Sequence, residues 1–123
     1  MTKPGYTGFK HVHAAAEYSK RGLRAAWQHE SAFRQECMLG ILMLPLAFLL
    51  GQNLAQTALL IAVCFLVLIV ELLNSAIEAV VDRVGHEHHE LAGRAKDMGS
   101  AAVALSLFLV WVTWGLVAIQ RLL

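Results

Sequence analysis

The chain has 123 residues, which allows one domain at most. Hydrophobic residues make up 58% of it and charged residues only 15%, whereas a typical soluble domain is about 25% charged. This composition excludes intrinsic disorder, which requires low hydrophobicity and high charge, and it leaves too little charge to cover a small soluble globule. The formal net charge of +1 gives no general attraction to nucleic acid or to acidic partners.

The charged residues are segregated along the chain. Residues 37–70 and 98–120 contain no Asp, Glu, Lys, Arg or His, and a membrane-spanning helix needs about 20 mainly apolar residues. The turn-forming residues Gly51, Gln52 and Asn53 divide the first of these runs in two. The sequence therefore predicts an all-α integral membrane protein, a single membrane domain over residues 1–123. Its three transmembrane helices are expected at about 33–50, 54–84 and 98–119.

The segment before the first span is predicted to be an amphipathic helix over about 6–29. Val12, Leu23 and Trp27 fall on one face at helical spacing, while Lys20 and Arg24 fall on another. A helix with Lys and Arg on its polar face is typical of the headgroup plane of a membrane. A soluble helix packed on a partner is the alternative interpretation.

The distribution of positive charge predicts the orientation. Six of the 10 Lys and Arg residues precede residue 37, three lie in 82–97, and Arg121 stands alone near the C-terminus. With three spans, the first two groups share one side of the membrane, which the positive-inside rule makes cytoplasmic. The C-terminus is then expected to face outward.

The second predicted span carries an unusual polar stripe. Glu71, Asn74, Ser75, Glu78 and Asp82 fall within about 100° of one another on a helix, although the rest of the span is apolar. Carboxylates on membrane helices are costly and usually mark a site or a partner. Asn and Ser alone often hold neighbouring helices together, but two glutamates favour a functional site.

Other polar residues flank the predicted spans. Glu30 and Glu36 precede or begin the first span, where they either extend the carboxylate group or remain surface charges. Arg94 and Lys96, with nearby glycines, suit an anion such as phosphate. A further cluster could bind a transition metal, although a solvated loop is the favoured interpretation; it comprises His86, Glu87, His88, His89 and Glu90.

No P-loop or other glycine-rich nucleotide motif is present in the sequence. Carboxylates beside basic residues at the membrane surface suit a divalent cation together with a phosphate-bearing ligand. Mg²⁺, for example, is typically held by one or two carboxylates and by the phosphates of a substrate.

Four runs of residues resemble the prokaryotic diacylglycerol kinase family. ELLNSAIEAVVDR at 71–83 and ELAGRAKDMGSAA at 90–102 match the family, and GLRAAW at 22–27 and AFRQE at 32–36 match its Gram-negative branch. The resemblance implies a homotrimer in the inner membrane, with three spans and one surface helix in each chain. It implies transfer of the γ-phosphate of MgATP to the hydroxyl group of diacylglycerol, giving phosphatidic acid.

The resemblance also implies roles for individual residues. Glu71 corresponds to the general base, Asn74 to a polar residue that supports it, and Glu30 and Glu78 to the ligands of Mg²⁺. The implied ATP-binding residues are His11, Tyr18, Glu30, Glu78, Glu87, His88, His89, Lys96 and Asp97. The implied lipid-binding residues are Ala15, Ala16, Glu17, Ser19, Lys20, Arg24, Ala25, Ala26, Trp27, Ala32, Phe33, Arg34, Gln35, Glu36, Glu71 and Ser100.

The family plan further implies active sites shared between neighbouring chains, with Glu30 from one chain and Glu71 and Glu78 from the next. The sequence departs from the family at His11, where an Arg is usual, and at His88, where a Tyr is usual. Three alternative functions stay open: an undecaprenol kinase, a small proton- or metal-coupled transporter that uses the two glutamates of the stripe as a relay, and a non-enzymatic membrane assembly subunit.

Overall fold

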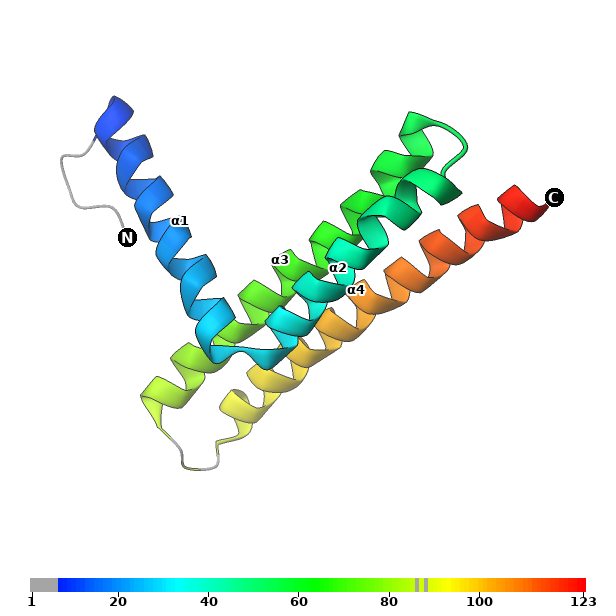
Figure 1. The fold of residues 1–123 in the computed structure, drawn as a ribbon. Helices are drawn as coiled ribbons and strands as arrows, with labels where there is room; N and C mark the ends of the chain where they lie inside the picture. The colour runs from blue at the N-terminus through cyan, green and yellow to red at the C-terminus, as the bar shows by residue number, and fades with distance from the viewer. Residues whose placement is uncertain (1–6, 86, 88) are drawn as a thin grey trace.

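The computed structural model describes residues 7–85, 87 and 89–123, which form four helices and, within those residues, no strand. They are α1 (Gly8–His29), α2 (Ser31–Leu50), α3 (Leu54–Val84) and α4 (Glu90–Leu122). Helices α2, α3 and α4 lie side by side as a bundle, and α1 leaves that bundle at a steep angle (Figure 1). The predicted all-α class is confirmed.

Three of these helices, α2, α3 and α4, are long and apolar enough to cross a membrane. The predicted number of spans is therefore confirmed, and the protein is a multi-pass membrane protein. The last helix begins at Glu90, before the expected start at residue 98. The polar residues before 98 continue the helix beyond the apolar stretch, and the His89 side chain caps it by accepting a hydrogen bond from the Leu91 N–H at 3.1 Å.

The turn between α2 and α3 is set by its own side chains. The Asn53 side chain accepts a hydrogen bond from the Gln56 N–H at 2.9 Å, and the Gln56 side chain accepts one from the Gln52 N–H at 2.8 Å. The Asn53 bond satisfies a backbone donor that the start of a helix leaves without a partner, and the Gln56 bond ties the turn to the first turn of α3. A Cβ atom on Gly51 would collide with the Thr57 hydroxyl oxygen, so the turn requires glycine at that position.

A small apolar core lies beside this turn. Ala47 and Leu60 are fully buried and Val117 is nearly so, and these residues come from α2, α3 and α4. The Trp114 indole N–H donates a hydrogen bond to the Leu60 carbonyl oxygen at 3.2 Å and ties α4 to α3. This end of the bundle is held by packing and by the Trp114 hydrogen bond.

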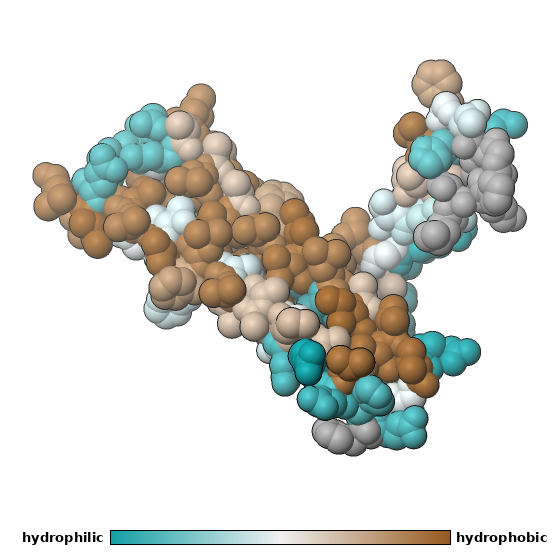
Figure 2. Space-filling model, turned by 180° about the vertical axis from the view of Figure 1, so that it is seen from behind, coloured by the Kyte–Doolittle hydropathy of each residue, from teal (hydrophilic) through white to brown (hydrophobic). Residues whose placement is uncertain are grey.

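Most of the large apolar side chains lie on the outside of the bundle. Phe48, Phe65, Leu105 and Trp111 are among those that are more than half exposed. Hydrophobic residues cover the length of the bundle, and hydrophilic residues gather at its two ends (Figure 2). An apolar surface of this extent suits lipid or neighbouring chains rather than water.

Helix α1 is attached to the bundle at one end only. Glu30 is the single residue between α1 and α2, and its backbone is extended, with φ −118° and ψ 103°. The Arg34 guanidinium donates hydrogen bonds to the carbonyl oxygens of Trp27 at 2.6 Å and Gln28 at 3.4 Å. A cation that binds the last carbonyls of a helix also interacts favourably with the helix dipole. The predicted helix is confirmed from Gly8 onward, and its connection to the bundle is fixed by Arg34.

Candidate active site

Four carboxylates gather where α1 and α2 meet α3. Glu71 is buried, with 7% of its surface exposed, and the charges of Glu36, Glu30 and Glu78 all act on it. We call these four residues the carboxylate cluster. So many negative charges around a buried group are unfavourable unless cations or protons compensate them. Of the two interpretations that the sequence left open for Glu30 and Glu36, the structure favours extension of the carboxylate group over isolated surface charges.

This gathering takes place within one chain. Glu30 lies between α1 and α2, and Glu71 and Glu78 lie on α3 of the same chain. The expected division of Glu30 and Glu71 between neighbouring chains is therefore not needed to bring these carboxylates together.

Asn74 links the carboxylate cluster to α4. Its side-chain N–H donates a hydrogen bond to Glu78 Oε1 at 3.2 Å. Its Oδ1 atom is buried and has no hydrogen-bond partner among the described residues. A Cβ atom added to Gly99 on α4 would collide with that same Oδ1. Asn74 thus orients Glu78, and its side chain occupies the space that a side chain at position 99 would take.

A cation lies beside the carboxylate cluster. Lys96 Nζ on α4 lies 2.7 Å from Asp82 Oδ1 on α3, one helical turn beyond Glu78. The charge of Glu78 also acts on Lys96. Asp97 and Ser100, on the same helix, are exposed. The structure therefore places an ammonium group and the carboxylates at the same end of the bundle.

A cavity of about 550 Å³ separates α1 from α3 next to the carboxylate cluster. Its α1 side includes three residues that the family resemblance assigns to lipid binding, namely Ser19, Ala25 and Ala26, and Glu30 also lines it. Its α3 side is built largely of small side chains, namely Ser75, Ala76 and Ala79. Of these, Ser75 belongs to the polar stripe predicted from the sequence. Ala76 and Ala79 give no such signal, because alanine is common on an apolar span, and only the structure shows that they line the cavity.

Other residues expected at the site do not line the cavity between α1 and α3. The N-terminal half of α1 points away from the bundle (Figure 1). It carries His11, Ala15, Ala16, Glu17 and, nearer the middle of the helix, Tyr18. Lys20, Arg24, Trp27, Ala32 and Gln35 are exposed, Phe33 is buried, and Arg34 binds the end of α1.

The loop between α3 and α4 forms a separate hollow. Glu87 and His89 line a cavity of about 320 Å³ together with apolar residues such as Val84 and Leu91. His86 and His88, which completed the possible metal cluster, lie outside the described residues. Within the described part of the chain, no three His, Cys, Asp or Glu side chains are grouped to hold a metal ion.

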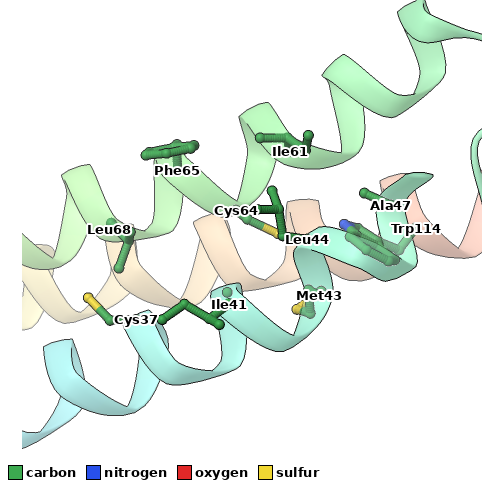
Figure 3. A pocket seen from close by; sticks show the side chains of 11 residues that line it. Cys37, Ile41, Met43, Leu44, Ala47, Ile61, Cys64, Phe65, Leu68 and Trp114 are labelled. Atoms are coloured by element: carbon green, nitrogen blue, oxygen red, sulfur yellow. The ribbon is translucent and has the colours of Figure 1, made fainter. Parts of the chain in front are cut away.

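An apolar pocket of about 290 Å³ lies within the spans, between α2 and α3 (Figure 3). Ile41 and Leu44 line it from α2, Phe65 lines it from α3, and Trp114 closes it from α4. Both cysteines also line it and both are free. Apart from these thiols its lining is apolar, with no carboxylate, histidine, lysine or arginine side chain, and the charged groups lie at the carboxylate cluster instead.

A membrane bundle with carboxylates and a lysine at one end belongs to the class of membrane proteins suited to hold a divalent cation and a phosphate-bearing ligand at the bilayer surface. The model of the family described as prokaryotic diacylglycerol kinase matches residues 17–118. The chain therefore belongs to that family and is a lipid kinase.

Relatives extend over nearly the whole chain. The diacylglycerol kinase of Escherichia coli (strain K12) is 55% identical over 108 residues, which cover 88% of each protein. That of Pseudomonas aeruginosa is 54% identical over 110 residues, covering 89% of each. That of Haemophilus influenzae is 49% identical over 109 residues, covering 89% of this chain and 92% of the relative.

Proposed function

We propose that this protein transfers the γ-phosphate of MgATP to the free hydroxyl group of diacylglycerol, producing phosphatidic acid and ADP. The observation that carries the proposal is the buried Glu71, which lies among three further carboxylates beside a cavity that opens between α1 and α3. A lipid hydroxyl group is a weak nucleophile at neutral pH, and a positioned carboxylate is a suitable base for it.

In the proposed reaction the hydroxyl oxygen of the lipid attacks the γ-phosphorus of ATP. Glu71 accepts the hydroxyl proton as the new oxygen–phosphorus bond forms. The bond between the γ-phosphorus and the bridging oxygen to the β-phosphate breaks, and ADP leaves with that oxygen. Transfer of this kind depends mainly on positioning and on neutralisation of charge.

Glu30 and Glu78 are the proposed ligands of Mg²⁺. A preformed cage of three or more protein ligands is not found among the described residues, and Mg²⁺ does not need one, because it is usually held by one or two carboxylates plus phosphates. The donor set therefore fits a cation that arrives with ATP, and when bound it would neutralise charge on the phosphates. Asn74 keeps Glu78 in place, and Lys96 faces the phosphates.

The cavity between α1 and α3 is the proposed place of the lipid headgroup. Helix α1 exposes apolar residues such as Phe9 and Leu23, as expected for a helix that lies in the headgroup plane. This arrangement puts the hydroxyl group of the acceptor at the membrane surface beside Glu71. We assign this surface to the cytoplasmic side of the inner membrane, with the C-terminus outward, from the distribution of Lys and Arg.

We further propose that three copies of this single membrane domain form a trimer. One chain assembles the carboxylate cluster by itself, but it leaves the proposed nucleotide contacts His11 and Tyr18 on the arm that points away from the bundle. In the trimer that arm would reach the active site of a neighbour. Of the other proposed nucleotide contacts, Glu87 and His89 lie in the loop between α3 and α4, and Asp97 lies on α4.

The test is transfer of label to lipid. Purified protein in mixed micelles receives ATP labelled in the γ-phosphate, Mg²⁺, and either diacylglycerol or undecaprenol. Labelled phosphatidic acid is the expected product, and label in undecaprenyl phosphate alone would select the alternative kinase. If neither alcohol is labelled by protein that is folded and binds MgATP, the kinase proposal fails and the transporter becomes the leading interpretation.

A further inference from the structure

The closest ion pair among the described residues joins α3 to α4 at the edge of the carboxylate cluster. The Asp82 carboxylate lies 2.7 Å from the Lys96 ammonium group, and both side chains are about half exposed, at 50% and 44%. The other ion pair, Glu90 with Arg94, lies within α4 and is longer, at 3.4 Å. The resemblance to the family assigns a role to Lys96 but none to Asp82.

We propose that Asp82 is a positioning residue for phosphoryl transfer, because it holds the Lys96 ammonium group in the place where the nucleotide phosphates arrive. This inference depends on the proposed function, since it takes the phosphates to lie beside Lys96. It adds a residue that acts on the nucleotide only through another side chain.

The chemistry of the two groups supports this role. A lysine side chain is a flexible point charge, and most of its rotamers would carry the ammonium group away from the carboxylate cluster. An ammonium group has three donors, so Lys96 can keep one hydrogen bond to Asp82 and still donate two to phosphate oxygens. Asp82 thereby selects the useful rotamer before the nucleotide binds, and less conformational entropy is lost on binding.

Two other roles for the pair, a contribution to stability and a simple charge effect, predict different results from positioning. Ion pairs that are half exposed contribute little to stability, so loss of this one should hardly change the unfolding of the protein. If Asp82 acted only as a nearby negative charge, its removal would reduce repulsion and tighten the binding of MgATP. Positioning predicts the opposite sign, weaker binding of MgATP.

The experiment measures KM for MgATP and for diacylglycerol, together with kcat, in purified protein in mixed micelles. In Asp82→Asn we expect KM for MgATP to rise about five-fold, the upper range for a half-exposed ion pair, with KM for diacylglycerol unchanged. Asp82→Glu keeps the charge and should recover most of the loss. Glu90→Gln is the matched control, because it removes the other ion pair of α4, and it should leave both constants unchanged.

A double-mutant cycle with Lys96→Met separates action through Lys96 from any direct effect. We expect Lys96→Met to raise KM for MgATP at least as much as Asp82→Asn does. In the Lys96→Met background, Asp82→Asn should raise KM for MgATP no further. An unchanged or lower KM in Asp82→Asn, or a full additional loss in the double variant, would overturn the inference. If Lys96→Met itself leaves KM unchanged, the phosphates do not lie at Lys96 and the inference also fails. Labelled phosphatidic acid made by the wild-type protein would still uphold the lipid kinase.

Discussion

Replacing Gly99 by alanine should disturb the active site from a helix that carries none of the four clustered carboxylates. An added Cβ atom would collide with the buried Asn74 Oδ1 and would lie 3.2 Å from Asn74 Cγ. Either the Asn74 side chain or the backbone of α4 must therefore move. Because the Asn74 side chain donates to Glu78 Oε1, movement of Asn74 would displace a proposed Mg²⁺ ligand.

The expected magnitude follows from two opposing terms. Alanine is more favourable than glycine within a helix by up to about 1 kcal/mol. Overpacking of a well-filled contact typically costs about 1–3 kcal/mol. Gly115→Ala is the matched control, since it lies on the same helix and nothing lies within 4 Å of its added Cβ atom. The free energy of unfolding should then differ by about 1–3 kcal/mol between the two variants, with Gly99→Ala the less stable.

The assay is unfolding in mixed micelles, followed by helix content, with turnover measured at a series of Mg²⁺ concentrations. Gly99→Ala should need more Mg²⁺ to reach half of its maximal rate, whereas Gly115→Ala should match the wild type. Equal stability and an equal Mg²⁺ requirement in the two variants would show that α4 does not approach Asn74 as closely as described. The link from Gly99 through Asn74 to Glu78 would then have to be abandoned.

Two further predictions concern the carboxylate cluster and the trimer. Glu30→Gln and Glu78→Gln should each raise the Mg²⁺ concentration required for ATP binding and turnover, and a change confined to the apparent affinity for lipid would remove them from the metal. Joint refolding of Glu71→Gln chains with His11→Ala/Tyr18→Ala chains should restore activity, because a mixed trimer can join an intact cluster to an intact neighbouring arm. Mixing Glu30→Gln with Glu71→Gln chains should restore none, since one chain supplies both residues, and activity in that second mixture would place them on different chains.

The sequence predicted the features that depend on periodicity and charge. An apolar run with a turn in it predicts two spans, and a carboxylate every one or two turns predicts the stripe that contains Glu71 and Glu78. The sequence did not predict contacts between helices, because spacing along one helix does not show which residue of another helix lies opposite. The pairing of Asp82 with Lys96 and the contact of Asn74 with Gly99 are both of this kind.

The place of Glu30 was open for a related reason. A residue before a span can lie in solvent or turn back onto the bundle, and the choice depends on the angle between α1 and α2. The Arg34 side chain fixes the end of α1 by binding its last carbonyl oxygens, a contact that charge patterning does not reveal. Helix α4 begins before the predicted span at 98–119 because a helix can continue past the apolar residues that cross the membrane.

The most direct test of the central claim is a single-turnover measurement of γ-phosphate transfer from bound MgATP to diacylglycerol, in the wild type and in Glu71→Gln. The variant keeps the shape of the side chain and loses the proton acceptor. We predict unchanged MgATP binding and a transfer rate lower by about 10²–10⁴-fold, the usual contribution of a general base. A folded Glu71→Gln protein that transfers phosphate at the wild-type rate would contradict the claim that Glu71 is the base of this lipid kinase.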